Sequence, residues 1–108
     1  MIVDIITLSG ITASDGTTIE AGAVVKFDSE FYAGSSDIRV RPRIFRSREF
    51  FENGFDSVGT NKKIGEFKIQ LSNDDYYTLT PLNLYHHVAN TLNEIFDGQI
   101  FEVSVTEE

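Results

Sequence analysis

The chain lacks several features on which stability or catalysis often depends. Its 108 residues include no cysteine, no tryptophan and only two prolines. Without cysteine, neither a disulfide framework nor a thiolate metal site can form, so stability must come from packing or from partners. The first eight residues have no basic region and carry Asp4 within their apolar run, which fits neither a signal peptide nor a membrane span. We therefore expect a protein made in a cytoplasm, with no membrane partner.

Positive charge is also scarce. Nine lysines and arginines stand against 17 acidic residues, which gives a formal net charge of −8. The long-range field of such a chain repels phosphates, and this disfavours non-specific attraction to nucleic acid or anionic lipid. We therefore expect at most passing contact with DNA.

The composition is that of an ordinary folded domain. The hydrophobic fraction is 41% and the charged fraction is 24%, and aromatic residues make up 12% of the chain. These values are close to the average for globular proteins and argue against disorder. A chain of this length forms one domain and can bury a real core, so we expect a single domain over residues 1–108.

All five arginines of the chain lie within residues 39–48, where there is no acidic residue. Arg39, Arg41 and Arg43 alternate with apolar residues. On a strand, one face would therefore carry three guanidinium groups and the other would be buried. Pro42 donates no ladder hydrogen bond, which places this strand at the edge of a sheet. The other 98 residues have four lysines and all 17 acids, so a positive ridge would sit on a negative body.

Apolar alternation and turn residues predict the other strands and loops. Besides the arginine strand, the predicted strands are 2–8, 19–27 with a bulge or bend at Gly22, 64–71, 76–79 and 101–105. The predicted turns and loops are 14–17, 28–36, 57–63 and 72–75. Residues 45–55 are compatible with either a short helical turn or a loop that ends at Asn53-Gly54.

A helix over residues 81–96 has the clearest local signals. Thr80 is a suitable N-cap, Pro81 suits the first helical position, and Asp97-Gly98 closes the segment. At 100° per residue, the apolar side chains fall within an arc of about 160°. We therefore predict an α+β fold, in which one amphipathic helix packs across a mostly antiparallel sheet or a small open barrel.

The sequence offers no catalytic, cofactor-binding or metal-binding residues. His86 and His87 are adjacent on the predicted helix, so their side chains diverge and cannot share one ion. Asp74 and Asp75 lie in a turn-forming run, where such carboxylates bond their own backbone. No Gly-x-Ser-x-Gly elbow and no glycine-rich phosphate loop is present. We expect the protein not to be an enzyme and to use no cofactor.

The arginine segment is therefore the candidate site, and three interpretations remain open. Its charges could protect an exposed sheet edge from unwanted pairing. They could instead meet carboxylates of another copy, head to tail, which produces rings or filaments. They could also bind an anionic ligand or nucleic acid, with Phe45, Phe50 and Phe51 available for stacking. The predicted interface residues are Arg39, Arg41, Arg43, Arg46 and Arg48.

Two segments and the single late helix resemble a known class of proteins. Residues 16–27, GTTIEAGAVVKF, and residues 40–54, VRPRIFRSREFFENG, look like the small structural virion proteins of tailed bacteriophages, particularly tail and neck components. The resemblance implies a non-enzymatic subunit of the virion, repeated in a ring beside other virion proteins. Many tail tubes have an acidic lumen along which DNA slides, and the excess of carboxylates here is similar. The chain is short for a major tube subunit.

Overall fold

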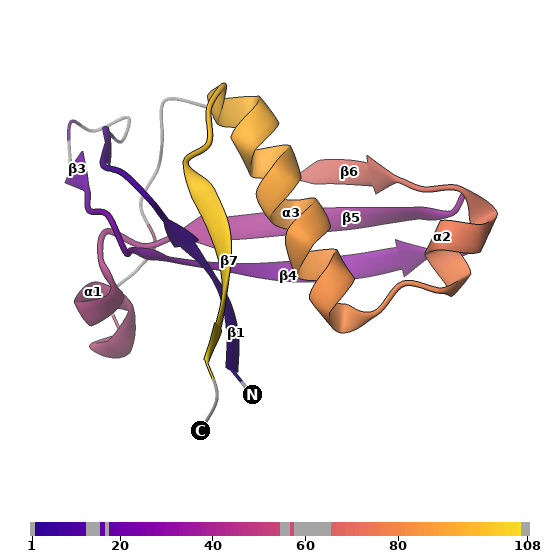
Figure 1. The fold of residues 1–108 in the computed structure, drawn as a ribbon, viewed down its shortest axis with the longest axis horizontal. Helices are drawn as coiled ribbons and strands as arrows, with labels where there is room; N and C mark the ends of the chain where they lie inside the picture. Colours follow the sequence, from indigo (N-terminus) through magenta and orange to yellow (C-terminus); the bar gives the residue numbers. More distant parts are fainter. Residues whose placement is uncertain (1, 13–15, 17, 55–56, 58–65, 107–108) are drawn as a thin grey trace.

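The computed structural model describes residues 2–12, 16, 18–54, 57 and 66–106, which form two sheets and three helices (Figure 1). The strands are β1 (Ile2–Thr7), β2 (Ile11–Thr12), β3 (Thr18–Ile19), β4 (Val24–Tyr32), β5 (Asp37–Ile44), β6 (Phe67–Gln70) and β7 (Phe101–Thr106). The helices are α1 (Arg48–Glu52), α2 (Asn73–Tyr77) and α3 (Pro81–Phe96). The main sheet is antiparallel in the order β6-β5-β4-β1-β7, and β2 and β3 form a separate ribbon.

This architecture confirms the predicted α+β class. The sheet is open, with β6 at one edge and β7 at the other, and α3 lies across one face (Figure 1). The alternate residues of β4 and β5 that point toward α3, such as Val25 and Ile38, are buried with the apolar side of that helix. On α3, Leu84, Val88 and Leu92 supply this contact.

The bounds of α3 agree with the prediction at both ends. The Thr80 hydroxyl accepts a hydrogen bond from the Asn83 N–H at 3.2 Å, and Pro81 occupies the first turn. At the other end, Asp97 takes the left-handed conformation with φ 59°, and its N–H bonds back into the helix. These local capping groups fix where the helix starts and stops.

The prediction that the arginine strand is an edge strand is wrong. β5 lies between β4 and β6, and β6 pairs with its first half, residues 37–40. Over the described residues, the second half, residues 41–44, pairs with β4 alone. Pro42 lies in that second half, where its missing N–H leaves no gap in the β6 ladder.

Two further local predictions are wrong. Residues 28–32 were expected in a loop, but β4 continues through them to Tyr32, because they pair with residues 37–41 of β5. Residues 76–79 were expected to be a strand, but Tyr76 and Tyr77 complete α2, which begins at the N-cap Ser72. Most of the predicted loop 57–63 and most of the predicted turn 14–17 lie outside the described residues.

The first and second predicted strands are confirmed with a refinement. A bend does occur at Gly22, whose φ is +82°, a conformation that glycine adopts at low cost. It separates the short β3 from β4, and the β2-β3 ribbon lies between β1 and this bend in the chain order. The predicted last strand and the predicted strand near residue 69 appear as β7 and β6.

A short helix covers one end of the sheet face that α3 leaves uncovered. Of the two interpretations of residues 45–55, the helical turn is correct, as α1, with Ser47 as its N-cap. Phe45 and Phe51 meet edge to face at 4.9 Å, and the Lys26 ammonium lies 4.9 Å from the Phe51 ring centre. Val24 and Phe45 are buried there, apart from the main core cluster.

Candidate functional site

The sheet face opposite α3, here called the outer face, carries the predicted arginine row. Successive strand residues alternate between faces, so the even positions of β4 and the odd positions of β5 point away from the core. On β4, β5 and β6, the charged residues of the outer face are Lys26, Asp28, Glu30, Asp37, Arg39, Arg41, Arg43 and Lys68. The predicted alternation is therefore confirmed, since Arg39, Arg41 and Arg43 are all exposed on one face.

Each arginine of β5 lies opposite a charged residue of β4, which is acidic for Arg39 and Arg41 and basic for Arg43. Arg39 is in register with Glu30, and Arg43 is in register with Lys26. Arg41 is in register with Asp28 but forms its ion pair diagonally, with Glu30. The positive row is thus partly neutralised within the chain, which the sequence pattern of β5 alone did not reveal.

The Glu30 carboxylate is the centre of a small polar network. The Tyr32 hydroxyl donates a hydrogen bond to it at 2.8 Å. That bond, followed by the charge of Arg41, lowers the pKa of Glu30, and the same bond raises the pKa of Tyr32. Arg39 stacks on the Tyr32 ring, with its guanidinium carbon 4.4 Å from the ring centre. Arg39 and Arg41 are therefore both engaged by side chains of β4.

Two more of the predicted interface arginines have partners around α1. Arg48 lies 3.6 Å from a carboxylate oxygen of Asp4, whose other oxygen is 2.7 Å from the Lys26 ammonium. The Arg46 guanidinium lies 5.0 Å from the Phe50 ring centre. Asp4 is 8% exposed, so the two cations compensate a largely buried carboxylate.

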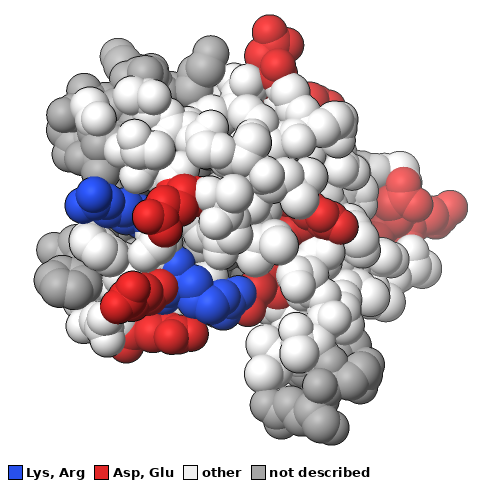
Figure 2. All heavy atoms as spheres, turned by 60° about the vertical axis from the view of Figure 1, so that its left-hand side comes forward, with Lys and Arg blue, Asp and Glu red and all other residues white. Residues whose placement is uncertain are grey.

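Arg43 differs from the other four arginines. Within the described part of the chain it has no ion pair and no ring contact, and its side chain is exposed. Its neighbour across the ladder, Lys26, is turned toward Asp4. Figure 2 shows lysine, arginine and several acidic side chains lying together on one side of the view, while other acidic side chains lie apart from them. Arg43 is thus the one predicted interface residue whose guanidinium is not engaged by described residues.

An aromatic surface at the other end of β4 was missed by the sequence reasoning. Phe31 is 55% exposed and Tyr77 is 70% exposed, and both rings meet Tyr76 edge to face, at 6.2 Å and 5.1 Å. A hollow of about 310 Å³ lies beside them. It is lined by Phe31, Tyr76, Leu79, Thr80, Pro81 and Leu84. Ser72 three residues before Asp75 is a capping pattern that could have indicated α2.

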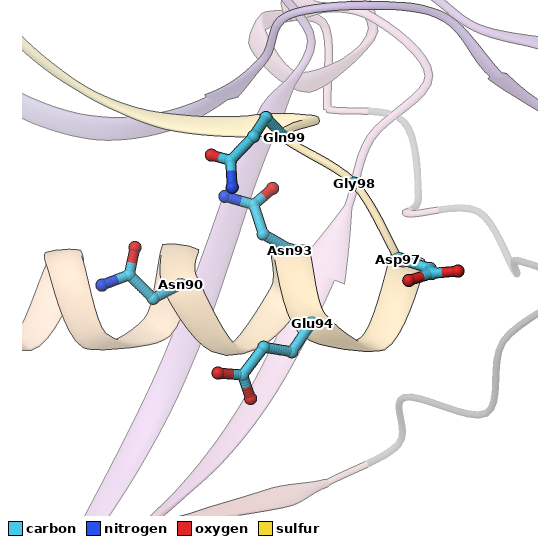
Figure 3. A pocket seen from close by; sticks show the side chains of 6 residues that line it. All are labelled: Asn90, Asn93, Glu94, Asp97, Gly98 and Gln99. Carbon is cyan, nitrogen blue, oxygen red and sulfur yellow. The ribbon is translucent and has the colours of Figure 1, made fainter.

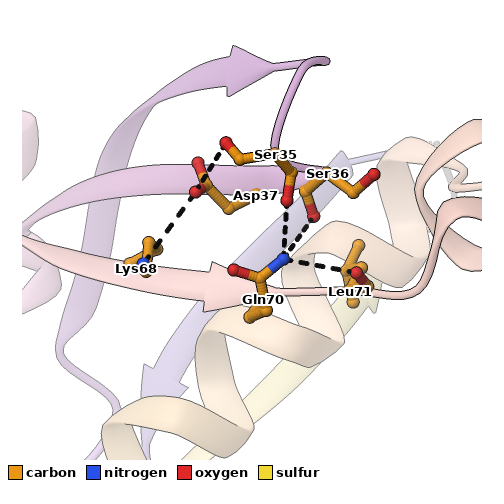
Figure 4. Close-up of polar contacts among 6 residues, drawn as sticks. All are labelled: Ser35, Ser36, Asp37, Lys68, Gln70 and Leu71. Atoms are coloured by element: carbon orange, nitrogen blue, oxygen red, sulfur yellow. Dashed lines mark hydrogen bonds and ion pairs between the residues drawn. The ribbon is translucent and has the colours of Figure 1, made fainter.

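Hydrogen bonds hold this aromatic end in place (Figure 4). The Gln70 amide donates to the carbonyls of Ser35 and Ser36, at 2.7 and 3.4 Å, and so joins the β4-β5 turn to β6. Asp37, only 2% exposed, accepts a bond from the Ser35 hydroxyl at 2.9 Å, and its carboxylate lies 4.0 Å from the Lys68 ammonium. The turn that precedes β5 is therefore fixed to the neighbouring strand.

A polar groove of about 330 Å³ lies at the C-terminal end of α3 (Figure 3). Its lining residues are Asn90, Asn93, Glu94, Asp97, Gly98 and Gln99. Glu94 and Asp97 point to different sides, and the Asn93 amide is bonded to the backbone of residues 100–101. The groove therefore contains no pair of converging carboxylates.

The histidines and the paired aspartates lie apart. His86 is exposed and His87 is half-buried on α3, and Asp74 and Asp75 are exposed in the first turn of α2. Among the described residues, no group of three or more potential ligands could hold a metal ion.

Comparison of the chain with protein-family models, with curated proteins and with solved structures gave no match. Of the helices in the described ranges, none combines the length and the hydropathy needed to cross a bilayer.

Proposed function

We propose that the chain is a non-enzymatic structural subunit of a tailed-phage virion, of the tail tube or neck type, which assembles into rings through its outer face. The observation that carries this proposal is the exposed guanidinium of Arg43, which no described residue engages, on a chain of net charge −8. Carboxylates of another copy are the most abundant complement for it. The resemblance of residues 16–27 and 40–54 to phage tail and neck proteins supports the virion assignment.

The chemistry of arginine favours a protein contact at this position. Its planar fork binds carboxylates with two hydrogen bonds, and arginine is enriched in interfaces where lysine is depleted. Protection of a sheet edge does not explain Arg39, because that residue lies where β5 is flanked by strands on both sides. Over the described residues, Arg41 and Arg43 lie where β5 pairs with β4 alone, so edge protection is an alternative explanation at these two positions.

An anionic ligand or nucleic acid is less well supported. A polyanion requires several cations that are available together. Lys26 and Arg48 are directed at Asp4, and Arg41 is paired with Glu30. Among the five arginines, the described residues leave one guanidinium unengaged, and this does not make a continuous positive groove.

Substitution of Arg43 tests the proposal. Arg43→Glu is expected to convert oligomers to monomers, and Arg43→Gln to weaken assembly, as measured by size-exclusion chromatography with light scattering. Arg41→Gln is the matched control, since Arg41 lies on the same strand and already has Glu30 as partner. Unchanged oligomers of Arg43→Glu, with an unchanged circular dichroism spectrum, would rule out this joint. Electron microscopy of the wild-type oligomer should show closed rings.

A further inference from the structure

We infer that the partner of Arg43 is the aromatic end of a second copy. The aromatic end is the surface formed by Phe31, Tyr76 and Tyr77, together with the adjacent hollow and with Asp74 and Asp75 of α2, here called the acidic rim. This inference rests on the proposed function and specifies which surface is met by the end of the molecule that carries Arg43, here called the arginine end. The two surfaces lie at opposite ends of the same strands. β4 and β5 run from α1, near Arg43, to α2, near Phe31 (Figure 1). Copies joined end to end would therefore bring unlike surfaces together.

The aromatic end has the composition of an interface core. Phe31 and Tyr77 expose more than half of their surface, in contact with a third ring. Aromatic residues dominate the energetics of protein interfaces, and a cluster of exposed rings is unusual on a monomer. The adjacent hollow of about 310 Å³ can receive a side chain of the neighbour.

Complementary charge indicates that the molecule bound at the aromatic end is a second copy of this chain. Asp74 and Asp75, in the first turn of the helix that carries Tyr76 and Tyr77, are exposed, and in the described residues neither carboxylate has an ion pair. The arginine end offers Arg43 with the opposite charge, beside Arg46 and Arg48 of the α1 region. A guanidinium that pairs with these carboxylates can also stack on the Tyr77 ring, a contact that arginine makes better than lysine.

The contact is heterologous, because it joins two different surfaces of identical chains. Each copy then presents one arginine end and one aromatic end, and repetition closes into a ring or extends as a filament. The longest dimension of the chain is 40 Å, along which the two ends are separated. One copy can therefore hold two neighbours at once without the neighbours competing for the same surface.

A mixing experiment tests the pairing of the two ends. Arg43→Glu blocks the arginine end, and the double variant Asp74→Lys, Asp75→Lys blocks the acidic rim. Each variant alone is expected to be monomeric by light scattering. An equimolar mixture should form mixed oligomers that contain the two variants in equal amounts, because the unaltered ends pair with each other and the two reversed charges are also complementary. A third protein that carries Arg43→Glu together with Asp74→Arg and Asp75→Arg is expected to assemble again.

Milder substitutions guard against loss of folding. Asp74→Asn with Asp75→Asn keeps the shape of α2 and should raise the concentration for half-assembly by about tenfold, as should Tyr77→Ala. Glu94→Asn with Asp97→Asn, at the C-terminal end of α3, is the matched control and should assemble like the wild type.

The outcomes separate the two proposals. If Arg43→Glu is monomeric while the α2 variants assemble normally, Arg43 binds elsewhere and the aromatic end is not its partner. If both blocked variants are monomeric but their mixture gives no mixed oligomer, the two ends do not bind each other. If Arg43→Glu assembles normally, the proposed outer-face joint itself is wrong. A mixed oligomer supports both proposals.

Discussion

Asn93 shows how a single polar side chain can fix a connection between two elements. It is 7% exposed on α3, and its side-chain oxygen accepts bonds from the N–H groups of Ile100 and Phe101 at 2.8 and 2.7 Å. Its amide nitrogen donates to the Phe101 carbonyl at 3.0 Å. The side chain thus satisfies the backbone where β7 begins, so its burial carries no unpaired polar group.

Removal of the Asn93 amide is expected to destabilise the protein. Asn93→Ala would leave the buried N–H of Phe101 and that of Ile100 without their acceptor, and each lost partner of this kind costs about 1–3 kcal/mol. We expect the free energy of unfolding in urea to fall by about 2–4 kcal/mol. Asn90→Ala, at an exposed position on the same helix, should change it by less than about 0.5 kcal/mol.

The Glu30 network makes a prediction about pH. The Tyr32 hydrogen bond and the Arg41 charge stabilise the ionised carboxylate, so its pKa lies below the ordinary glutamate value. This contribution to stability is present above that ordinary value and is lost as the pH falls through the lowered pKa. An NMR titration should show the Glu30 pKa rising in Tyr32→Phe and in Arg41→Gln. A Glu30 pKa that neither substitution raises would contradict the network.

At the scale of elements, one capping side chain fixes the start of α3. The Thr80 hydroxyl accepts a hydrogen bond from the Asn83 N–H, so Thr80→Ala should lower the free energy of unfolding by about 1 kcal/mol. Thr80→Ser keeps a capping hydroxyl and should lower it much less. Thr91→Ala is a useful contrast. The Thr91 hydroxyl donates to the His87 carbonyl inside the helix, and alanine has the higher helix propensity, so this change should not destabilise the protein. Urea unfolding of the three variants measures both effects.

The predictability of each element follows from where its determinants lie in the chain. Both ends of α3 were predicted, because Thr80, Pro81 and Asp97 act on backbone within one turn of themselves. α2 was not predicted, because residues 72–75 also have the composition of a turn and the pair Tyr76-Tyr77 favours a strand. The interior place of β5 depends on its pairing with β6, more than 25 residues away, and Pro42 alone gave no information about it.

The candidate site likewise has features that the sequence of β5 alone predicts and features that depend on distant parts of the chain. Strand alternation was enough to place Arg39, Arg41 and Arg43 on one exposed face. Their partners come from β4, through a register that the sequence of β5 does not contain. The two arginines differ in their ion pairs. Arg41 pairs with Glu30, whereas the residue opposite Arg43 is Lys26, which has the same charge. The aromatic end could not be predicted without α2, because Tyr77 and Phe31 are distant in sequence.

For the whole molecule, the distribution of charge sets two opposing effects on assembly. Each copy has a net charge of −8, so copies repel one another at long range, while the proposed contact joins unlike charges at short range. The screening length of a salt solution is about 30 Å at 0.01 M, about 10 Å at 0.1 M and about 3 Å at 1 M. Moderate salt therefore weakens the long-range repulsion more than the ion pairs at the joint.

We accordingly expect assembly to depend on salt in two directions. Between 0.01 and about 0.1 M NaCl, the mass measured by light scattering should rise at fixed protein concentration, because the repulsion between the acidic bodies is screened first. Toward about 1 M it should fall, because the pairs between Arg43 and the rim carboxylates are then screened as well. Arg43→Gln should keep the rise and lose much of the fall, since its joint contains fewer ion pairs. A mass that increases steadily up to 1 M would show that apolar contacts dominate the joint, and a monomer at every salt concentration would contradict assembly altogether.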